Sequence, residues 1–212
     1  MPLGAFLVLH LWVNAWAMQG ELRYDAVVRR IQSVPGLLFF ETVLIYVPLL
    51  FHAGYGIWTM RTTSSVRRRG KYDAPWAVRL QRTSGLVTLA FLGYHLFSIR
   101  AEVALGTMRP ADFYSVLTDT LGSTTSLGIP RSAVLYFVGL AAASYHLAGG
   151  LLGFCFTWGI AVTEGRYRVA RALSTAVGLS LFLLGARTIV YFATGAAFPS
   201  FGSGAPSAGA LN

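Results

Sequence analysis

Five blocks of apolar residues alternate with short polar segments along this chain. The blocks cover residues 3–18, 36–60, 78–99, 132–158 and 170–194. Each block approaches or exceeds the roughly 20 apolar residues that an α-helix needs to cross about 30 Å of hydrocarbon. None of them shows the strict apolar–polar alternation of strands in a membrane barrel. The pattern therefore predicts an all-α fold, an integral membrane bundle of five transmembrane helices within residues 1–197.

The composition is that of a chain whose solvent is a bilayer. Hydrophobic residues make up 55% of the sequence and charged residues only 12%, whereas a soluble domain carries about 25% charged residues. Residues 198–212 are rich in Gly, Ser and Ala and carry no charge, so we expect a disordered C-terminal tail. The single cysteine, Cys155, lies in an apolar block and excludes both an intrachain disulfide and a cysteine-ligated cluster.

The charges between the blocks predict the orientation. The net charge is +9, and most basic residues sit in two connections instead of on one face, which indicates a membrane surface and not nucleic acid. These residues are Arg61, Arg67, Arg68, Arg69, Lys71, Arg79 and Arg82 around the second connection, and Arg166, Arg168 and Arg171 in the fourth. The positive-inside rule then places the N-terminus on the cytoplasmic side of the inner (cytoplasmic) membrane and the C-terminus outside.

All four histidines lie in the apolar blocks, each in a different one: His10, His52, His95 and His146. An ionisable side chain in hydrocarbon is costly unless it has a partner. Interhelical hydrogen bonding would explain one such histidine. Four of them, one per helix and none in a connection, are better explained as metal ligands.

The residues that are missing indicate which metal. A zinc or di-iron site would use carboxylates or cysteines near the histidines, and Glu41 is the only acid in the blocks. Neutral imidazoles in a dry bundle suit haem iron, and two histidines per iron give a six-coordinate centre that passes electrons. The sequence therefore predicts two b haems.

The depth of each histidine in its block predicts how the four are paired. His10 and His95 fall in the outer halves of their blocks, and His52 and His146 fall nearer the cytoplasmic ends. At about 1.5 Å per residue, we expect His10 and His95 to share an outer haem and His52 and His146 to share an inner one.

Other polar and small residues are candidates for contacts with a haem or a quinone. Arg187 lies well inside the last block, where a guanidinium needs a propionate or quinone partner unless it snorkels to the outer surface. Glu41 could move protons at a quinone site, or it could simply be a solvated acid at the start of a helix, where its charge complements the helix dipole. Gln81, Arg82 and Ser84 could meet the inner propionates or a docked subunit. The small residues near the histidines fit either a macrocycle or ordinary helix packing: Gly54, Gly56, Gly93, Ser144, Gly149, Gly150 and Gly153.

Four stretches carry a resemblance to a known family. They are PLGAFLVLHLWVNAWAMQG at 2–20, VPLLFHAGYGIW at 47–58, LQRTSGLVTLAFLGYH at 80–95 and YHLAGGLLGFCFTWGIAVT at 145–163. Together they resemble the five-helix, dihaem cytochrome b subunit of succinate:quinone oxidoreductases. The resemblance implies axial ligation by His10, His52, His95 and His146. It also implies a membrane anchor for flavoprotein and iron–sulfur subunits, which passes electrons between succinate or fumarate and a quinone, typically menaquinone.

The sequence departs from that family at its beginning. The family has a basic stretch and a His-Ser motif before the first helix, whereas Met1 stands almost at the point where the match starts. We therefore expect the true start codon to lie upstream.

Several functions compete with this one. A fumarate reductase running in reverse, or a cytochrome b anchor for a formate or hydrogen enzyme, would use the same haems. A transporter could line a path with histidines, but the symmetry-related broken helices common in transporters are not found. A purely structural anchor would hold no haem. If the chain is the subunit of a succinate:quinone oxidoreductase, we expect the inner haem to receive the electrons. We expect the outer haem to serve a quinone near Glu41 and Arg187.

Overall fold

The computed structural model describes residues 2–62, 75–101, 103, 105–109 and 112–196. Over these ranges the chain forms helices joined by turns and short connections, with no strand. The predicted C-terminal tail and the basic cluster at 67–71 lie outside the described residues.

The first apolar block forms helix α1 (Pro2–Ala15), which passes into a 3-10 turn, η1 (Trp16–Gln19). Gly20 then adopts φ 98°, a backbone conformation that favours glycine, and ends this segment. Helix α2 (Glu21–Gln32) follows and was not predicted. Its first turn carries an acid and its last turn two arginines, so both ends complement the helix dipole.

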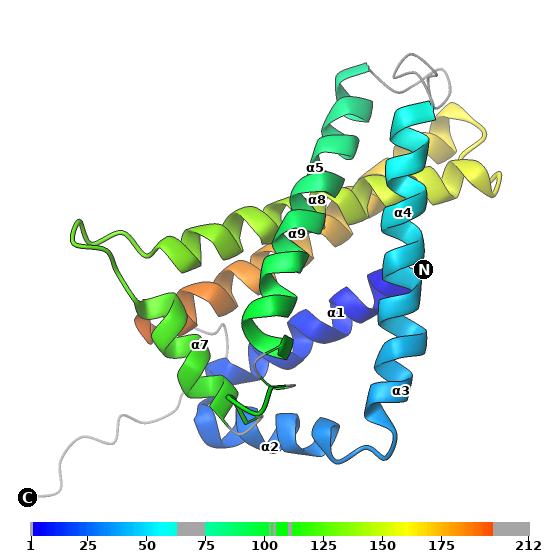
Figure 1. The fold of residues 1–212 in the computed structure, drawn as a ribbon. Helices are drawn as coiled ribbons and strands as arrows, with labels where there is room; N and C mark the ends of the chain where they lie inside the picture. The colour runs from blue at the N-terminus through cyan, green and yellow to red at the C-terminus, as the bar shows by residue number, and fades with distance from the viewer. Residues whose placement is uncertain (1, 63–74, 102, 104, 110–111, 197–212) are drawn as a thin grey trace, which may run out of the picture.

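The second block forms one continuous helix, Leu37–Thr62. It consists of α3 (Leu37–Glu41), a π turn η2 (Thr42–Tyr46) and α4 (Val47–Thr62). The π turn ends two residues before Pro48, which has no N–H for the helix and whose ring would crowd the Leu44 carbonyl in a regular turn. None of residues 37–62 is buried, and the helix stands apart from the other long helices at the side of the molecule (Figure 1).

The remaining blocks also form helices. They are α5 (Pro75–Leu96), which continues into the π turn η3 (Phe97–Ala101), α8 (Arg131–Thr157) and α9 (Glu164–Thr194). A further short helix, α7 (Phe113–Gly122), was not predicted. Helix α9 begins six residues before the predicted position 170, because the Thr163 side chain accepts a hydrogen bond from the Arg166 N–H and caps the helix.

Three of the described helices are long and apolar enough to cross a membrane: Leu37–Thr62, α8 and α9. The predicted all-α class is thus confirmed over the described residues, with three candidate membrane spans. The first and third predicted spans form helices too, but α1 has only 14 residues, fewer than the roughly 20 that a perpendicular crossing needs. Five crossings remain a prediction.

Helix α8 is at the centre of the packing. It lies along α9 on one side and contacts α5 on another, while α1 and α7 contact α9 (Figure 1). Small residues let α8 and α9 approach closely. A Cβ added at Gly178 would lie 2.9 Å from the Ser144 carbonyl oxygen, and one at Gly185 would lie 2.7 Å from Leu140.

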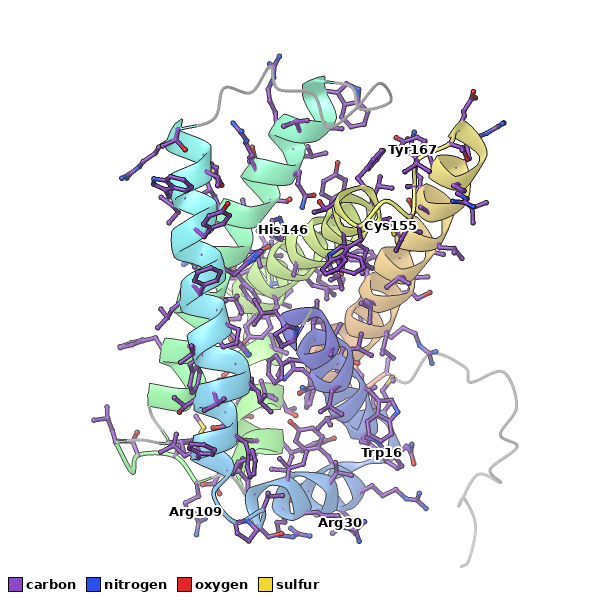
Figure 2. The ribbon with its side chains drawn as sticks, turned by 90° about the vertical axis from the view of Figure 1, so that its right-hand side faces the viewer. Trp16, Arg30, Arg109, His146, Cys155 and Tyr167 are labelled. Carbon is purple, nitrogen blue, oxygen red and sulfur yellow. The ribbon has the colours of Figure 1, made fainter. Side chains whose placement is uncertain are left out.

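The densest core lies at the end of the bundle that α2 and α7 close. Its members are Ala17, Tyr24, Val28, Leu117, Leu121, Ala133, Leu140, Ile189 and Phe192. Figure 2 shows Trp16, Arg30 and Arg109 at this end and Tyr167 toward the opposite one. The two unpredicted helices therefore form a cap over one end of the bundle, and we refer to α2 and α7 together as the cap.

Candidate metal centres

The structure brings the four histidines together in two pairs. His10 on α1 faces His95 on α5, with ring centroids 5.8 Å apart and ring planes at 81°. His52 on α4 faces His146 on α8, with centroids 6.0 Å apart and planes at 75°. These are the pairs that depth along the blocks indicated. Metal ligation by the pairs remains a prediction.

The spacing of each pair suits one metal ion between two imidazoles. A metal–imidazole bond is about 2.0 Å long, and a ring nitrogen lies about 1.1 Å from its centroid, so two rings on opposite sides of a metal have centroids about 6 Å apart. No group of three or more His, Cys, Asp or Glu able to hold a metal occurs in the part of the chain that the structure describes. Each pair thus offers two nitrogen ligands, which suits a metal whose other four ligands come from a macrocycle.

His146 is held against the backbone of α5. Its Nδ1 lies 3.1 Å from the Gln81 carbonyl oxygen, and the Gln81 side-chain Nε2 donates to the His146 carbonyl at 2.9 Å. Four residues after Gln81, a Cβ added at Gly85 would lie 2.8 Å from Cε1 of the His146 ring. Helix α5 therefore needs a glycine here for the imidazole to reach the carbonyl.

His95 is held from the other side of the same interface. Its Nδ1 lies 3.2 Å from the Tyr136 hydroxyl on α8. The Phe91 ring stacks on His95 and packs edge-on against Tyr136. A Cβ added at Gly139 would overlap the Phe91 ring, so α8 also carries a glycine where the aromatic cluster presses against it.

His10 is connected to the cap. The Asn14 amide, one turn later on α1, donates to the His10 carbonyl at 2.8 Å and lies 3.4 Å from the ring Nε2. Tyr24 on α2 donates its hydroxyl to the Asn14 side-chain oxygen at 3.3 Å. Burial, and to a lesser extent the charge of Asp25, raises the pKa of Tyr24, so this hydroxyl stays protonated and remains a donor.

His52 has different surroundings, because its side chain is exposed on α4. Open space lies beside glycines near three of the four histidines. A Cβ added at Gly54, Gly56, Gly93 or Gly150 would have no atom within 4 Å. These glycines lie two or four residues from His52, His95 or His146, so they add no side chain that would crowd a broad, flat group there. The residues therefore fit haem.

The structure also shows where other predicted contact residues lie. Arg187 is exposed, while its neighbours Thr188 and Ile189 are buried, and its contact with a propionate or a quinone stays a prediction. Gln81 and Ser84 belong to the α5–α8 interface, because Ser84 is 5% exposed and donates to the Gln81 carbonyl, and the Gln81 amide donates to the His146 carbonyl. Glu41 is half-buried at the end of α3.

Among the residues that touch the histidines, sequence reasoning missed Asn14, Gly85 and Tyr136. Asn14 could have been found, because it is a polar residue in an apolar block, four positions after His10 and hence on the same helix face. Gly85 and Tyr136 are ordinary residues for a membrane helix. Only the antiparallel register of α5 and α8 brings them against His146 and His95.

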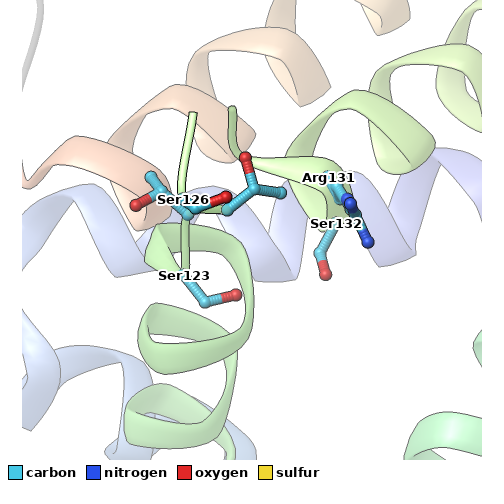
Figure 3. A pocket seen from close by; sticks show the side chains of 6 residues that line it. Ser123, Ser126, Arg131 and Ser132 are labelled. Atoms are coloured by element: carbon cyan, nitrogen blue, oxygen red, sulfur yellow. The ribbon is translucent and has the colours of Figure 1, made fainter. Parts of the chain in front are cut away.

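Two cavities lie outside the histidine pairs. One, of about 460 Å³, is lined by hydroxyl-bearing residues and Arg131 in the α7–α8 connection, where Ser123, Ser126, Arg131 and Ser132 surround it (Figure 3). The other, of about 900 Å³, lies between α8 and α9 and is mostly apolar, with Cys155 and Arg166 in its wall. None of the four histidines lines either cavity.

Comparison with known proteins agrees with this geometry. The chain is 29% identical over 192 residues to the succinate dehydrogenase cytochrome b558 subunit of Bacillus subtilis (strain 168), and the match covers 91% of both chains. No family model and no solved structure matches. The resemblance found in the sequence is therefore confirmed: over 91% of its length the chain is similar to a succinate dehydrogenase cytochrome b subunit.

Proposed function

We propose that this chain is the five-helix, dihaem cytochrome b subunit that anchors a succinate:quinone oxidoreductase. It passes electrons from an iron–sulfur subunit through two bis-histidine b haems to a quinone of the menaquinone type. The observation that carries the proposal is the pairing of four histidines from four helices. In each pair the two ring centroids are about as far apart as ligation of one iron between them requires.

The packing supports five crossings. Helix α5 contacts α8 near both of its ends, at Gln81–His146 and at His95–Tyr136. It therefore runs in the opposite direction to α8 where the two helices cross, and α8 is long enough to span a bilayer. Helix α1 contacts α9, which is also long enough. With α1 and α5 as further crossings, the bundle would have the five predicted spans.

The two haem sites would be separate. Ten residues divide Gly85 from His95 on α5, and ten divide Tyr136 from His146 on α8. At about 1.5 Å per residue, the two pairs lie about 15 Å apart along the helices. Haem b held by two histidines supplies a one-electron carrier without an open coordination position. The protein's part is to hold the imidazoles, leave space for the macrocycle and exclude water.

The direction of transfer follows from the proposed orientation. His146 lies in the C-terminal half of α8 and contacts Gln81 in the N-terminal half of α5, on the side of the basic connections, where positive charge favours the cytoplasm. The flavoprotein and iron–sulfur subunits would dock there, beside the inner pair, and the quinone would react near the outer pair, with Glu41 and Arg187 as candidate contacts. Fumarate reductase activity, or an anchor for another quinone-linked dehydrogenase, would use the same centres.

A reduced-minus-oxidised spectrum of the purified complex tests the proposal. We expect two low-spin haems b per copy of this chain, together with a flavoprotein and an iron–sulfur subunit, and reduction of haem by succinate. One haem per chain, or a high-spin centre, would contradict the histidine pairing. Reduction by formate or hydrogen but not by succinate would assign the chain to another dehydrogenase.

A further inference from the structure

The interface between α5 and α8 holds one histidine from each pair through the same ring atom. His146 of α8 has its Nδ1 at 3.1 Å from the Gln81 carbonyl of α5, and His95 of α5 has its Nδ1 at 3.2 Å from the Tyr136 hydroxyl of α8. The arrangement is reciprocal, since each helix supplies one ligand and the support for the other. The two remaining histidines come from α1 and α4.

A hydrogen bond at Nδ1 decides which nitrogen is free for a metal. When Nδ1 carries the proton and donates to an oxygen, Nε2 keeps its lone pair and can ligate iron. The bond also fixes the orientation of the ring and increases the electron density that the imidazole gives to the metal. The Gln81 Nε2 also lies 3.3 Å from the His146 Nδ1. In the tautomer that carries its proton on Nδ1, His146 donates to the Gln81 carbonyl and His95 to the Tyr136 hydroxyl, so both effects are available before any haem is present.

Two further features show that the His146 contact is built into α5. The Gly85 position has no side chain, and a Cβ there would lie 3.1 Å from Nδ1 and 2.8 Å from Cε1 of His146. Ser84, which is 5% exposed, donates its hydroxyl to the same Gln81 carbonyl at 3.0 Å. The Ser84 hydroxyl therefore competes with His146 for one acceptor oxygen.

We infer that α5 and α8 form a preorganised half of both haem sites, in which Tyr136 is the positioning residue for His95 and the Gln81 carbonyl, with Ser84 and Gly85, positions His146. This inference rests on the proposed function. It goes beyond ligand identity, because it assigns the strength of one outer ligand, His95, and one inner ligand, His146, to a particular hydrogen bond across one interface.

The inference predicts shifts of opposite sign at the two haems. In the tautomer that ligates iron through Nε2, His95 donates its Nδ1 proton to the Tyr136 hydroxyl. Tyr136→Phe removes this acceptor, which weakens the ligand, destabilises ferric iron and raises the midpoint potential of the outer haem alone. Ser84→Ala leaves the Gln81 carbonyl to His146, which strengthens that ligand and lowers the midpoint potential of the inner haem alone. Gly85→Ala should remove the inner haem and keep the outer one, because the added Cβ meets the ring.

The experiment is a spectrally monitored redox titration of the purified complex, with haem content measured by pyridine haemochrome. Two matched controls remove a hydroxyl away from the ligands. Tyr191→Phe removes a hydroxyl that bonds Tyr114, and Thr188→Val removes a buried hydroxyl that bonds the Leu184 carbonyl of its own helix. Both controls should leave the two potentials unchanged.

The outcomes separate this inference from the proposed function. Wild-type protein without haem would overturn the function itself. Two haems in the wild type, with Tyr136→Phe and Ser84→Ala both at wild-type potentials, would overturn the inference alone. Shifts at the wrong haem, or equal shifts in the controls, would also reject it. Gly85→Ala with both haems retained at unchanged potentials would show that His146 does not rest on α5.

Discussion

At the scale of single residues, the four histidines differ in how firmly the protein holds them. His95 and His146 are hydrogen-bonded across the α5–α8 interface. His10 contacts Asn14 on its own helix, and His52 is exposed on a helix without buried residues. The two proposed sites therefore have the same construction, with one ligand held by α5 and α8 and the other brought by a less packed helix.

Removing single histidines should separate the two sites. His10→Ala or His95→Ala should abolish one spectral component, and His52→Ala or His146→Ala the other, since a bis-histidine centre depends on both ligands. The measurement is a low-temperature reduced-minus-oxidised spectrum of each variant. Loss of the same component in His10→Ala and His52→Ala would disprove the pairing.

Arg187 gives a second prediction at this scale. The side chain is exposed on α9, and seven residues, about 10 Å, separate it from the end of the helix at Thr194. Arg187→Leu should slow quinone-linked turnover with both haem spectra intact if the guanidinium contacts quinone. A shifted outer-haem potential would indicate a propionate partner instead. If Arg187→Leu keeps both wild-type turnover and wild-type haem potentials, Arg187 contacts neither group and its side chain only snorkels to the surface.

At the scale of elements, α4 is the least packed of the long helices. None of residues 37–62 is buried, although α4 carries His52 opposite His146. A helix in a membrane gains little from apolar contact alone and depends on close packing or polar contacts. We infer that a group bound between His52 and His146 supplies much of what holds α4 in place.

This dependence can be measured by hydrogen exchange in detergent. His52→Ala should lose the inner haem and speed amide exchange in α4, while α8 and α9 keep their protection, because their contact does not involve that site. The matched control is His95→Ala, which should leave exchange in α4 near the wild-type rate. Unchanged protection of α4 in His52→Ala would show that direct helix packing holds it.

The α8–α9 contact should be sensitive to any added volume. A Cβ at Gly178 would meet the Ser144 carbonyl oxygen at 2.9 Å and the Ala148 Cβ at 2.8 Å, and backbone cannot move aside cheaply. Gly178→Ala should therefore lower the free energy of unfolding by about 1–3 kcal/mol, measured by denaturation in mixed detergent. Gly165→Ala on the same helix is the control, since a Cβ there has no atom within 4 Å. Equal stability of the two variants would refute the close approach.

At the scale of the whole molecule, the two ends of the bundle have different characters. One end is closed by the cap, whose aromatic residues Tyr24, Tyr114 and Phe192 pack against one another. The other end carries the exposed arginines of the α8–α9 connection and the start of α9. The exposed arginines make the basic end the candidate surface for the proposed docking of the soluble subunits.

Charge reversal at the basic end should weaken assembly. Arg168→Glu combined with Arg171→Glu should reduce binding of the flavoprotein and iron–sulfur subunits, most strongly at low salt, because surface charges act mainly on association. Arg30→Glu on the cap, at the opposite end (Figure 2), is the control and should leave binding unchanged. Assembly that is insensitive to the first pair but lost with Arg30→Glu would reverse the proposed orientation.

The sequence by itself determined the helical class, the membrane environment and the four histidines, because apolar block length and buried ionisable groups are local properties of the chain. It also indicated the pairs, since depth along a straight helix is a matter of counting residues. It missed the cap, because α2 and α7 are short and amphipathic and are stabilised by the core that they complete.

Only the tertiary structure decided which residues support the ligands and which way Arg187 points. Gly85 and Tyr136 meet His146 and His95 through the register of two antiparallel helices, and the buried face of α9 depends on its neighbours α1, α7 and α8. Such contacts join positions distant in sequence, so no local pattern encodes them. Composition sets which segments enter the membrane, and packing between helices sets what each histidine can bind.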